Sequence, residues 1–410
     1  MKRLSIITIF SFIFFISCDI DQQEPEYERV VTGAENLVEN YLGELEGKRI
    51  GLVMNPTARI GERHMLDILL EKEINLTALY APEHGFRGEA GAGDIIEDGV
   101  DQESGLPVFS LYGETRKPTE EMLDEVDILL FDMQDVGARF YTYHATMGLV
   151  MEAAADAGKP VWVLDRPNPI GGEYVSGWMM EDEHKSFVGP YEIPAAHGMT
   201  LGELAKMMVG ENWLDIESDS EPELKVIEMN GWDREMKWPD TGLEWVAPSP
   251  NLPTFEHAYI YLGTCLIEGT TLSEGRGTPD PFLTLGSPGT ELTDAQIADL
   301  NRNVEYATIT PAEFTPEEIP GVATSPKHEG ELSYGISIEL ESTDYDPVRS
   351  GLLILKTLMD ASNQAEVNDF MYRLTGTEKV DEILSGSADP MSLDFELDSF
   401  MEQREQYLIY

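Results

Sequence analysis

The sequence contains very little cysteine and few basic residues. Only Cys18 and Cys265 are cysteines among 410 residues, so a network of disulfide bonds is excluded and a packed apolar core must hold the fold. Lysine and arginine total 27 against 77 aspartates and glutamates, which gives a formal net charge of −50. Because such a surface repels polyanions, we expect no nucleic-acid partner.

The motifs of two common enzyme classes are also missing. No G-x-G-x-x-G or G-x-x-x-x-G-K-[ST] pattern follows the first internal apolar run, so nucleotide binding has no support. No G-x-S-x-G occurs either, which disfavours a serine nucleophile. The chemistry must therefore be sought in other residue types.

The N-terminal apolar stretch, 4–16, follows a basic start and is too short to span a bilayer comfortably. It ends next to Cys18, an arrangement that resembles a bacterial lipoprotein signal. We predict a signal peptide at 1–17, lipidation of Cys18, export, and anchoring in the cell envelope, at the periplasm or outer-membrane surface. An ordinary signal peptide with an incidental cysteine is the alternative. The acidic, polar segment 18–33 is typical of a tether.

Short apolar runs then alternate with helix-like stretches, a pattern that predicts βαβ units and a parallel sheet. The apolar runs are 49–55, 76–81, 108–112, 126–132 and 161–165, and the helix-like stretches are 62–72, 118–124 and 146–157. We predict a doubly wound, Rossmann-like α/β domain at 34–247. A smaller α/β (α+β) domain is expected at 248–410, because 334–340 alternates like a strand and 348–362 has a helical period.

Polar residues follow most of these runs, where the carboxyl ends of parallel strands would place them around one pocket. They are Asn55, Thr57, Glu83, His84, Asp132, Gln134, Asp135, Arg139, Tyr141, Tyr143, Asp165, Arg166 and Asn168. Each residue alone is equally well explained as a helix cap or turn residue. Four clusters on one sheet edge make a shared pocket the better interpretation.

Glu83 and His84 stand side by side at a predicted strand end, and glycines follow at 85, 88, 91 and 93. A carboxyl group in a partly dry pocket can serve as a general acid, and glycines let a ligand approach the backbone closely. This combination fits hydrolysis of a glycosidic bond, which also needs a second carboxylate or a substrate group. The candidates for that carboxylate are Asp132, Asp135, Glu268 and Glu274.

A metal site is an alternative interpretation of the same sheet edge. Glu83, His84, Asp132, His144 and Asp165 are residue types that ligate divalent ions. However, the seven histidines are scattered, and no H-x-H or H-E-x-x-H pair occurs. We therefore predict no metal.

Seven motifs in order along the chain resemble one known family. They are "NPTAR", "APEHGFRGEAGAG", "FDMQDVGARFYTY", "LDRPNPIGG", "HGMTLGELA", "PSPNLPT" and "EGTTLSEGRGTPDPF". Together they are similar to the exo-β-N-acetylmuramidase (NamZ-like) family, formerly a domain of unknown function. The resemblance extends from about Glu35 to Tyr410.

The resemblance implies a glycoside hydrolase that removes N-acetylmuramic acid from the non-reducing end of peptidoglycan fragments. It implies a Rossmann-like domain, a smaller C-terminal domain, an active site in the cleft between them, and no cofactor. The resemblance implies that Glu83 is catalytic, with the role of general acid, and that His84 either orients Glu83 or contacts the sugar. We predict Asp132 as a further catalytic residue. The predicted substrate-binding residues are Asn55, Gln134, Arg139, Tyr141, Tyr143, Asn168, His197, Asn251, Glu274 and Arg276.

Within that set, Arg139 and Arg276 are candidates to pair with the lactyl carboxylate of muramic acid. A structural ion pair with a neighbouring acid is the alternative for both. A lipoprotein that binds muropeptides without cleaving them is the rival to the enzyme as a whole. The sequence leaves open whether the anomeric configuration is retained and which oligomer forms.

Overall fold

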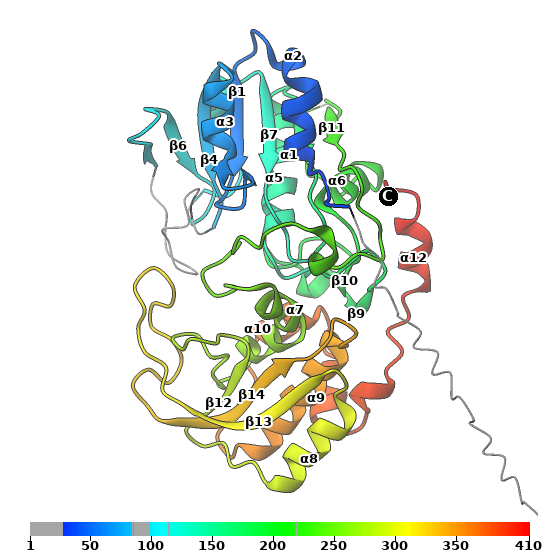
Figure 1. Cartoon of the computed structure of the whole chain (residues 1–410). Coiled ribbons are helices and arrows are strands. Elements are labelled where there is room, and N and C mark those ends of the chain that lie inside the picture. Colours follow the sequence, from blue (N-terminus) through cyan, green and yellow to red (C-terminus); the bar gives the residue numbers. More distant parts are fainter. Residues whose placement is uncertain (1–27, 84, 86–97, 114, 219) are drawn as a thin grey trace, which may run out of the picture.

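The computed structural model describes residues 28–83, 85, 98–113, 115–218 and 220–410. The predictions for Cys18 and His84, and for the glycines at 88, 91 and 93, lie outside these residues. Two lobes are visible, a first lobe built on a seven-stranded sheet and a second lobe built on a three-stranded sheet (Figure 1). Among the described residues, no helix is long and apolar enough to cross a membrane.

The sheet of the first lobe is parallel except at one edge, where β5 runs antiparallel to β6. Its strands in spatial order are β11 (Leu224–Ile227), β8 (Val161–Leu164), β7 (Ile128–Asp132), β1 (Ile50–Met54), β4 (Leu76–Ala81), β6 (Pro107–Ser110) and β5 (Gly99–Val100). Apart from β5, this is the 3-2-1-4-5-6 strand order of doubly wound Rossmann folds. The predicted fold class is confirmed.

Helices cover both faces of this sheet. Successive side chains of a strand point to opposite faces, and those of the central strands are apolar on both, so both faces must be shielded from water. On β1, Leu52 and Met54 belong to one core cluster and Val53 to the other. The first cluster includes residues of α1 (Gly33–Asn36), the π-helix η1 (Leu37–Tyr41), α2 (Leu42–Leu45) and α3 (Met65–Glu71). The second includes residues of α4 (Glu120–Leu123), α5 (Tyr143–Asp156) and α6 (Leu201–Gly210).

Short elements complete the first lobe. Two hairpins pair β2 (Arg59–Ile60) with β3 (Arg63–His64), and β9 (Ser176–Met179) with β10 (Pro194–Ala196); the single turns are η2 (Asp182–His184) and η3 (Trp238–Thr241). The end of the expected tether is part of this lobe. Val30 is fully buried, and the Val31 amide donates to the Asn230 carbonyl at 2.9 Å.

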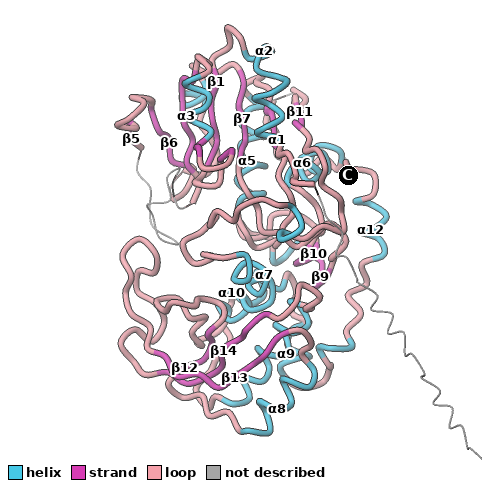
Figure 2. Tube along the Cα trace, in the orientation of Figure 1, coloured by secondary structure: helices cyan, strands magenta, loops and turns pink. Residues whose placement is uncertain are grey.

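The second lobe has an antiparallel sheet in the order β12 (Thr284–Ser287), β14 (Ser333–Leu340) and β13 (Ala307–Phe314). Its helices are α7 (Phe255–Thr264), η4 (Cys265–Gly269), α8 (Asp294–Asn303), α9 (Pro347–Ala361), α10 (Phe370–Thr375), α11 (Val380–Leu384) and η5 (Pro390–Ser392). Gly263 of α7 and Gly351 of α9 let these two helices pack closely, since a Cβ on Gly351 would lie 2.4 Å from the Gly263 Cα. In Figure 2, α7 and α10 lie between the three-stranded sheet and the first lobe.

The chain finally returns to the first lobe through α12 (Asp398–Arg404). Figure 1 shows α12 running along the side of the molecule to a C-terminus near α6 and β11. Tyr410 accepts a hydrogen bond from the Met229 amide and donates one to Asp165, each at 2.9 Å. The last residues therefore tie the second lobe back to the first.

Candidate active site

A cavity of about 460 Å³ lies between the two lobes. The first lobe lines it with Glu83, Tyr112, Arg116, Phe140, Tyr141, Thr142, Ser186, Phe187 and Val188. The segment before α7 and the second lobe line it with Ser249, Leu252, Tyr261, Cys265, Glu268, Arg276, Phe282, Phe370, Arg373 and Leu374. Its volume is in the range of small-molecule binding sites.

Glu83 enters this cavity because β4 ends two residues earlier, at the carboxyl edge of the parallel sheet. The Thr142 hydroxyl, from the N-terminus of α5, donates to Glu83 Oε2 at 3.2 Å. Tyr112, beyond the end of β6, lies near Glu83 in the lining of the cavity. Burial, followed by the charge of Glu83, raises the pKa of Tyr112 above its usual range, so the phenol stays protonated.

Aromatic rings form one wall of the cavity. Tyr261 contacts the rings of Phe282 at 4.7 Å, Phe140 at 5.4 Å and Tyr141 at 6.1 Å between centroids, each edge-on. Tyr143 packs edge-on against Tyr141 at 4.8 Å but is not among the lining residues. Such a wall combines an apolar surface with phenolic hydroxyl groups, which suits a sugar ring.

The second lobe contributes a carboxylate to the same cavity. Glu268 of η4 lines it, and its Oε1 lies 2.7 Å from Nη2 and 3.2 Å from Nε of Arg276. Glu274 is buried behind them, 3.6 Å from Arg276 and 3.0 Å from the Lys327 ammonium. Cys265 also lines the cavity, where burial raises the pKa of its thiol and keeps it neutral. Arg276 is therefore already paired with two carboxylates.

Two other predicted carboxylates lie at the sheet edge but not in the cavity lining. Asp132 is fully buried and forms a two-pronged ion pair with Arg166, at 2.6 Å and 3.1 Å. Asp135 accepts a hydrogen bond from the Gly137 amide at 2.9 Å and lies 3.7 Å from the His197 ring. These contacts favour a structural role for Asp132 and leave Glu268 as the predicted carboxylate that shares the cavity with Glu83.

Arg139 is fully buried and does not line the cavity. Its guanidinium donates to three carbonyl oxygens, those of Trp178 at 2.7 Å, Ile193 at 2.8 Å and Leu374 at 2.8 Å. Leu374 belongs to α10 of the second lobe. The structure thus places Arg139 as a bridge between the lobes, which favours a structural role over pairing with a substrate carboxylate.

Most of the other predicted binding residues hold the turns beneath the cavity. Four of them donate hydrogen bonds to backbone carbonyls: Gln134 to Pro167, Tyr143 to Pro248, Asn168 to Met199 and Asn251 to Val322. Two accept hydrogen bonds: Asn55 from the Thr57 amide and His197 from the Met199 amide. Of the predicted binding residues, the cavity lining contains only Tyr141 and Arg276. The remainder support the loops that carry the lining.

Several lining residues were not predicted from the sequence. They are Tyr112, Arg116, Thr142, Phe187 and Arg373. The position of Tyr112 at the end of a predicted strand was a usable signal, as was Thr142 inside "RFYTY". Arg373 carried no such signal, because α10 reaches the cavity only through the packing of the second lobe.

The metal interpretation gains no support from the described residues. Asp132 is paired with Arg166, His144 is buried with its pKa lowered to about 4 by burial, and Asp165 receives hydrogen bonds from Thr200 and Tyr410. Burial raises the pKa of Asp165 to about 7. The two aspartates are thus committed to separate contacts, and the His144 ring packs beside that of Tyr191 at 6.0 Å between centroids.

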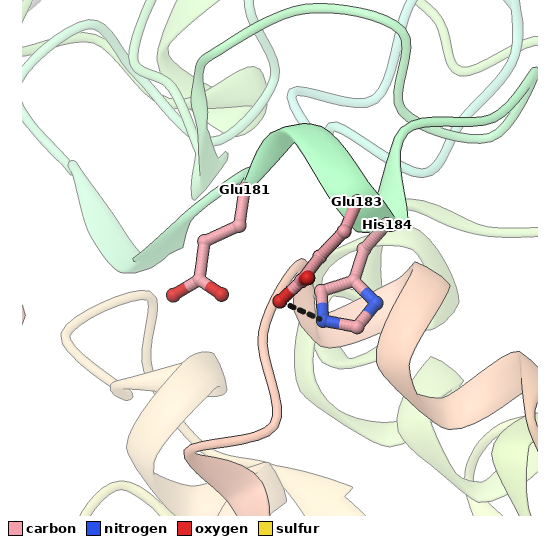
Figure 3. A group of neighbouring side chains, drawn as sticks. All are labelled: Glu181, Glu183 and His184. Carbon is pink, nitrogen blue, oxygen red and sulfur yellow. Dashed lines mark ion pairs between the residues drawn. The ribbon is translucent and has the colours of Figure 1, made fainter.

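Within the described part of the chain, one other group brings three potential ligand atoms within 4.8 Å of one another: Glu181, Glu183 and His184 (Figure 3). Glu181 already accepts a hydrogen bond from Thr377 at 2.8 Å. Glu183 is 72% exposed and lies 3.7 Å from the His184 ring. Glu183 and His184 thus form a surface ion pair, and Glu181 accepts a hydrogen bond that joins the two lobes.

The fold and the cavity define a two-lobed α/β protein with a carboxylate from each lobe in one cleft, an arrangement typical of glycoside hydrolases. Family models described as exo-beta-N-acetylmuramidase NamZ, N-terminal and C-terminal, match residues 50–256 and 259–410. The chain belongs to this NamZ family, and it is therefore an enzyme of the glycoside hydrolase class. The resemblance read from the seven motifs is confirmed.

Individual relatives agree with this assignment. The chain is 42% identical over 408 residues to the peptidoglycan beta-N-acetylmuramidase NamZ of Bacillus subtilis (strain 168), covering 96% of this chain and 94% of that protein. Two crystal structures of DUF1343 family proteins from Bacteroides fragilis NCTC 9343 are similar along 93% of this chain and 99% of theirs. Their TM-scores are 0.80 and 0.76, at 33% and 34% identity.

Proposed function

We propose that this chain is an exo-acting glycoside hydrolase that releases N-acetylmuramic acid from the non-reducing end of peptidoglycan fragments. Glu83 is the general acid of this reaction. One observation carries the proposal: Glu83 from the first lobe and Glu268 from the second line the same cavity. The similarity to the Bacillus subtilis enzyme supports the choice of substrate.

In the proposed mechanism, Glu83 gives its proton to the glycosidic oxygen as the bond to the anomeric carbon breaks. Thr142 keeps the carboxyl group in place through its hydroxyl group. Positive charge then develops on the sugar ring. Glu268, held by Arg276, or the acetamido group of the substrate stabilises that charge. A water molecule then forms a bond to the anomeric carbon and gives its proton to one of the two carboxylates, which completes the hydrolysis.

The proposal is tested with the purified protein lacking residues 1–17 and a chromogenic β-glycoside of N-acetylmuramic acid. Glu83→Gln keeps the shape of the side chain but lacks the acidic proton. We expect its kcat to fall by about 100- to 10,000-fold, the usual contribution of a general acid. Glu268→Gln should also lower kcat, since the charge facing the sugar is lost.

Glu339→Gln is the matched control, because Glu339 is exposed on β14 and does not line the cavity. It should retain the parent activity. A folded parent protein that binds the sugar without releasing the chromophore would instead establish the non-catalytic glycan-binding lipoprotein. Activity lost in chelator and restored by added metal would establish the metal-dependent hydrolase.

We also propose that the enzyme acts in the cell envelope, anchored by a lipid on Cys18. The basic start, the apolar stretch at 4–16 and the following cysteine support this location. Fractionation of cells that express the full chain or Cys18→Ala tests it. A variant that stays in the membrane fraction like its parent would contradict the anchor.

A further inference from the structure

The cavity between the lobes carries an unusual excess of arginine for this chain. Its lining includes Arg116, Arg276 and Arg373 beside the two carboxylates Glu83 and Glu268, whereas the whole sequence has 27 basic and 77 acidic residues. A cluster of cations inside so acidic a protein creates a local field that favours an anionic ligand. The three guanidinium groups differ in what already neutralises them.

Arg276 is neutralised within the protein, since Glu268 and Glu274 both lie within ion-pair distance of it. Arg116 and Arg373 differ, because neither forms an ion pair with any carboxylate among the residues that the structure describes. Arg116 stacks over the Phe187 ring at 4.3 Å, and both side chains are lining residues. Within the described part of the chain, no carboxylate occupies the hydrogen-bonding edges of these two guanidinium groups, which suits them to bind a ligand.

The two arginines reach the cavity from different lobes. Arg116 follows β6 in the first lobe, and its charge acts on Tyr112, which lies near Glu83. Arg373 lies in α10, next to Leu374, whose carbonyl accepts the hydrogen bond from Arg139. The backbone next to Arg373 therefore takes part in a contact between the lobes.

We propose that Arg116 and Arg373 bind the carboxylate of the acidic sugar and set the preference for an acidic over a neutral N-acetylhexosamine. The proposal rests on the function proposed above. N-Acetylmuramic acid differs from N-acetylglucosamine by a lactyl ether that ends in a carboxylate. Guanidinium groups match carboxylates in geometry and charge, and both arginines line the cavity that would hold the sugar. These residues replace Arg139 and Arg276 as the partners of that carboxylate.

The test compares three chromogenic β-glycosides, those of N-acetylmuramic acid, its lactyl methyl ester and N-acetylglucosamine. The methyl ester keeps the shape of the lactyl group but lacks its charge. For Arg116→Gln and Arg373→Gln we expect the ratio of kcat/KM for the acid to that for the ester to fall about 10- to 100-fold, mainly through KM. Binding of free N-acetylmuramic acid, measured by calorimetry, should weaken by a similar factor.

Arg302→Gln is the control, because Arg302 is exposed on α8, pairs with Asp299 at 2.6 Å and lies outside the cavity lining. It should leave both the ratio and the binding constant as in the parent. If the parent is active and both cavity variants keep its acid-to-ester ratio of kcat/KM, the arginine assignment alone is overturned. A folded parent that turns over none of the three glycosides would overturn the proposed function, and calorimetry would still show whether the arginines bind the acid.

Discussion

At the scale of single residues, the proposed proton transfer depends on how Glu83 is held. The Thr142 hydroxyl donates to Glu83 Oε2 and makes no capping hydrogen bond to α5. Its removal should therefore affect the carboxyl group more than the helix. A hydrogen bond that places a proton donor matters most in the transition state, where the proton moves.

We predict that Thr142→Val lowers kcat on the muramic acid glycoside about 10-fold with little change in KM, since one hydrogen bond contributes about 1–1.5 kcal/mol. Thr142→Ser keeps the hydroxyl and should remain close to the parent. Steady-state kinetics of the two variants provides the comparison. Equal activity of valine and serine at this position would show that the contact does not position Glu83.

The sequence predicted the residue that enters the cavity from β4 and, of the three cations around it, Arg276 but not Arg116 or Arg373. Glu83 follows a buried strand, so its place at the sheet edge was readable from local pattern alone. Arg139 lies in one of the seven motifs and was therefore predicted to bind the substrate, yet its guanidinium donates hydrogen bonds to three backbone carbonyl groups. Whether an arginine is free or satisfied depends on tertiary contacts, and no spacing in the sequence reports them.

At the scale of elements, the C-terminal segment is the main addition to the predicted fold. After α12, Tyr407 donates to Glu211 at 2.6 Å and the Ile409 amide donates to Glu203 at 3.0 Å. Tyr410 bridges Met229 and Asp165 and packs edge-on against Trp232 at 5.2 Å. The end of the chain is thus part of the first lobe, although it follows the second lobe in sequence.

We predict that Tyr410→Phe lowers the free energy of unfolding by about 1–3 kcal/mol, because the ring remains but the Met229 amide and the Asp165 carboxyl group each lose one hydrogen bond. Tyr306→Phe is the control, since Tyr306 is 45% exposed and its loss of a hydroxyl should have little effect. Denaturant titration of both variants measures the difference. Identical unfolding midpoints for the parent and Tyr410→Phe would show that the C-terminal segment adds no stability.

Predicted elements match the structure where an apolar run is buried on both faces. The apolar runs at 76–81 and 161–165 correspond to β4 and β8, and the predicted bounds of β4 agree with the observed strand at both ends. β11 follows an acidic segment and is only partly buried, and β13 carries Pro311, which is unusual within a strand. Neither strand has the pattern from which burial is normally inferred, so neither was predicted as a separate strand.

At the scale of the whole molecule, the cleft exists because the lobes are tied together at several points. Besides Arg139, Tyr174 donates to Asp346 at 2.6 Å and Thr377 donates to Glu181 at 2.8 Å. The partners in each pair are far apart in sequence and come from different lobes. The patterns of the sequence therefore predicted two domains, and the resemblance predicted the cleft between them. The contacts that set the geometry of the cleft required the structure.

The central claim is that this geometry removes one terminal sugar at a time. The most direct measurement is mass spectrometry of the products formed from a peptide-free glycan of alternating N-acetylmuramic acid and N-acetylglucosamine, with muramic acid at its non-reducing end. The account predicts free N-acetylmuramic acid and a chain one residue shorter, with neither product formed by Glu83→Gln. Disaccharides or internal fragments from the parent enzyme would contradict it.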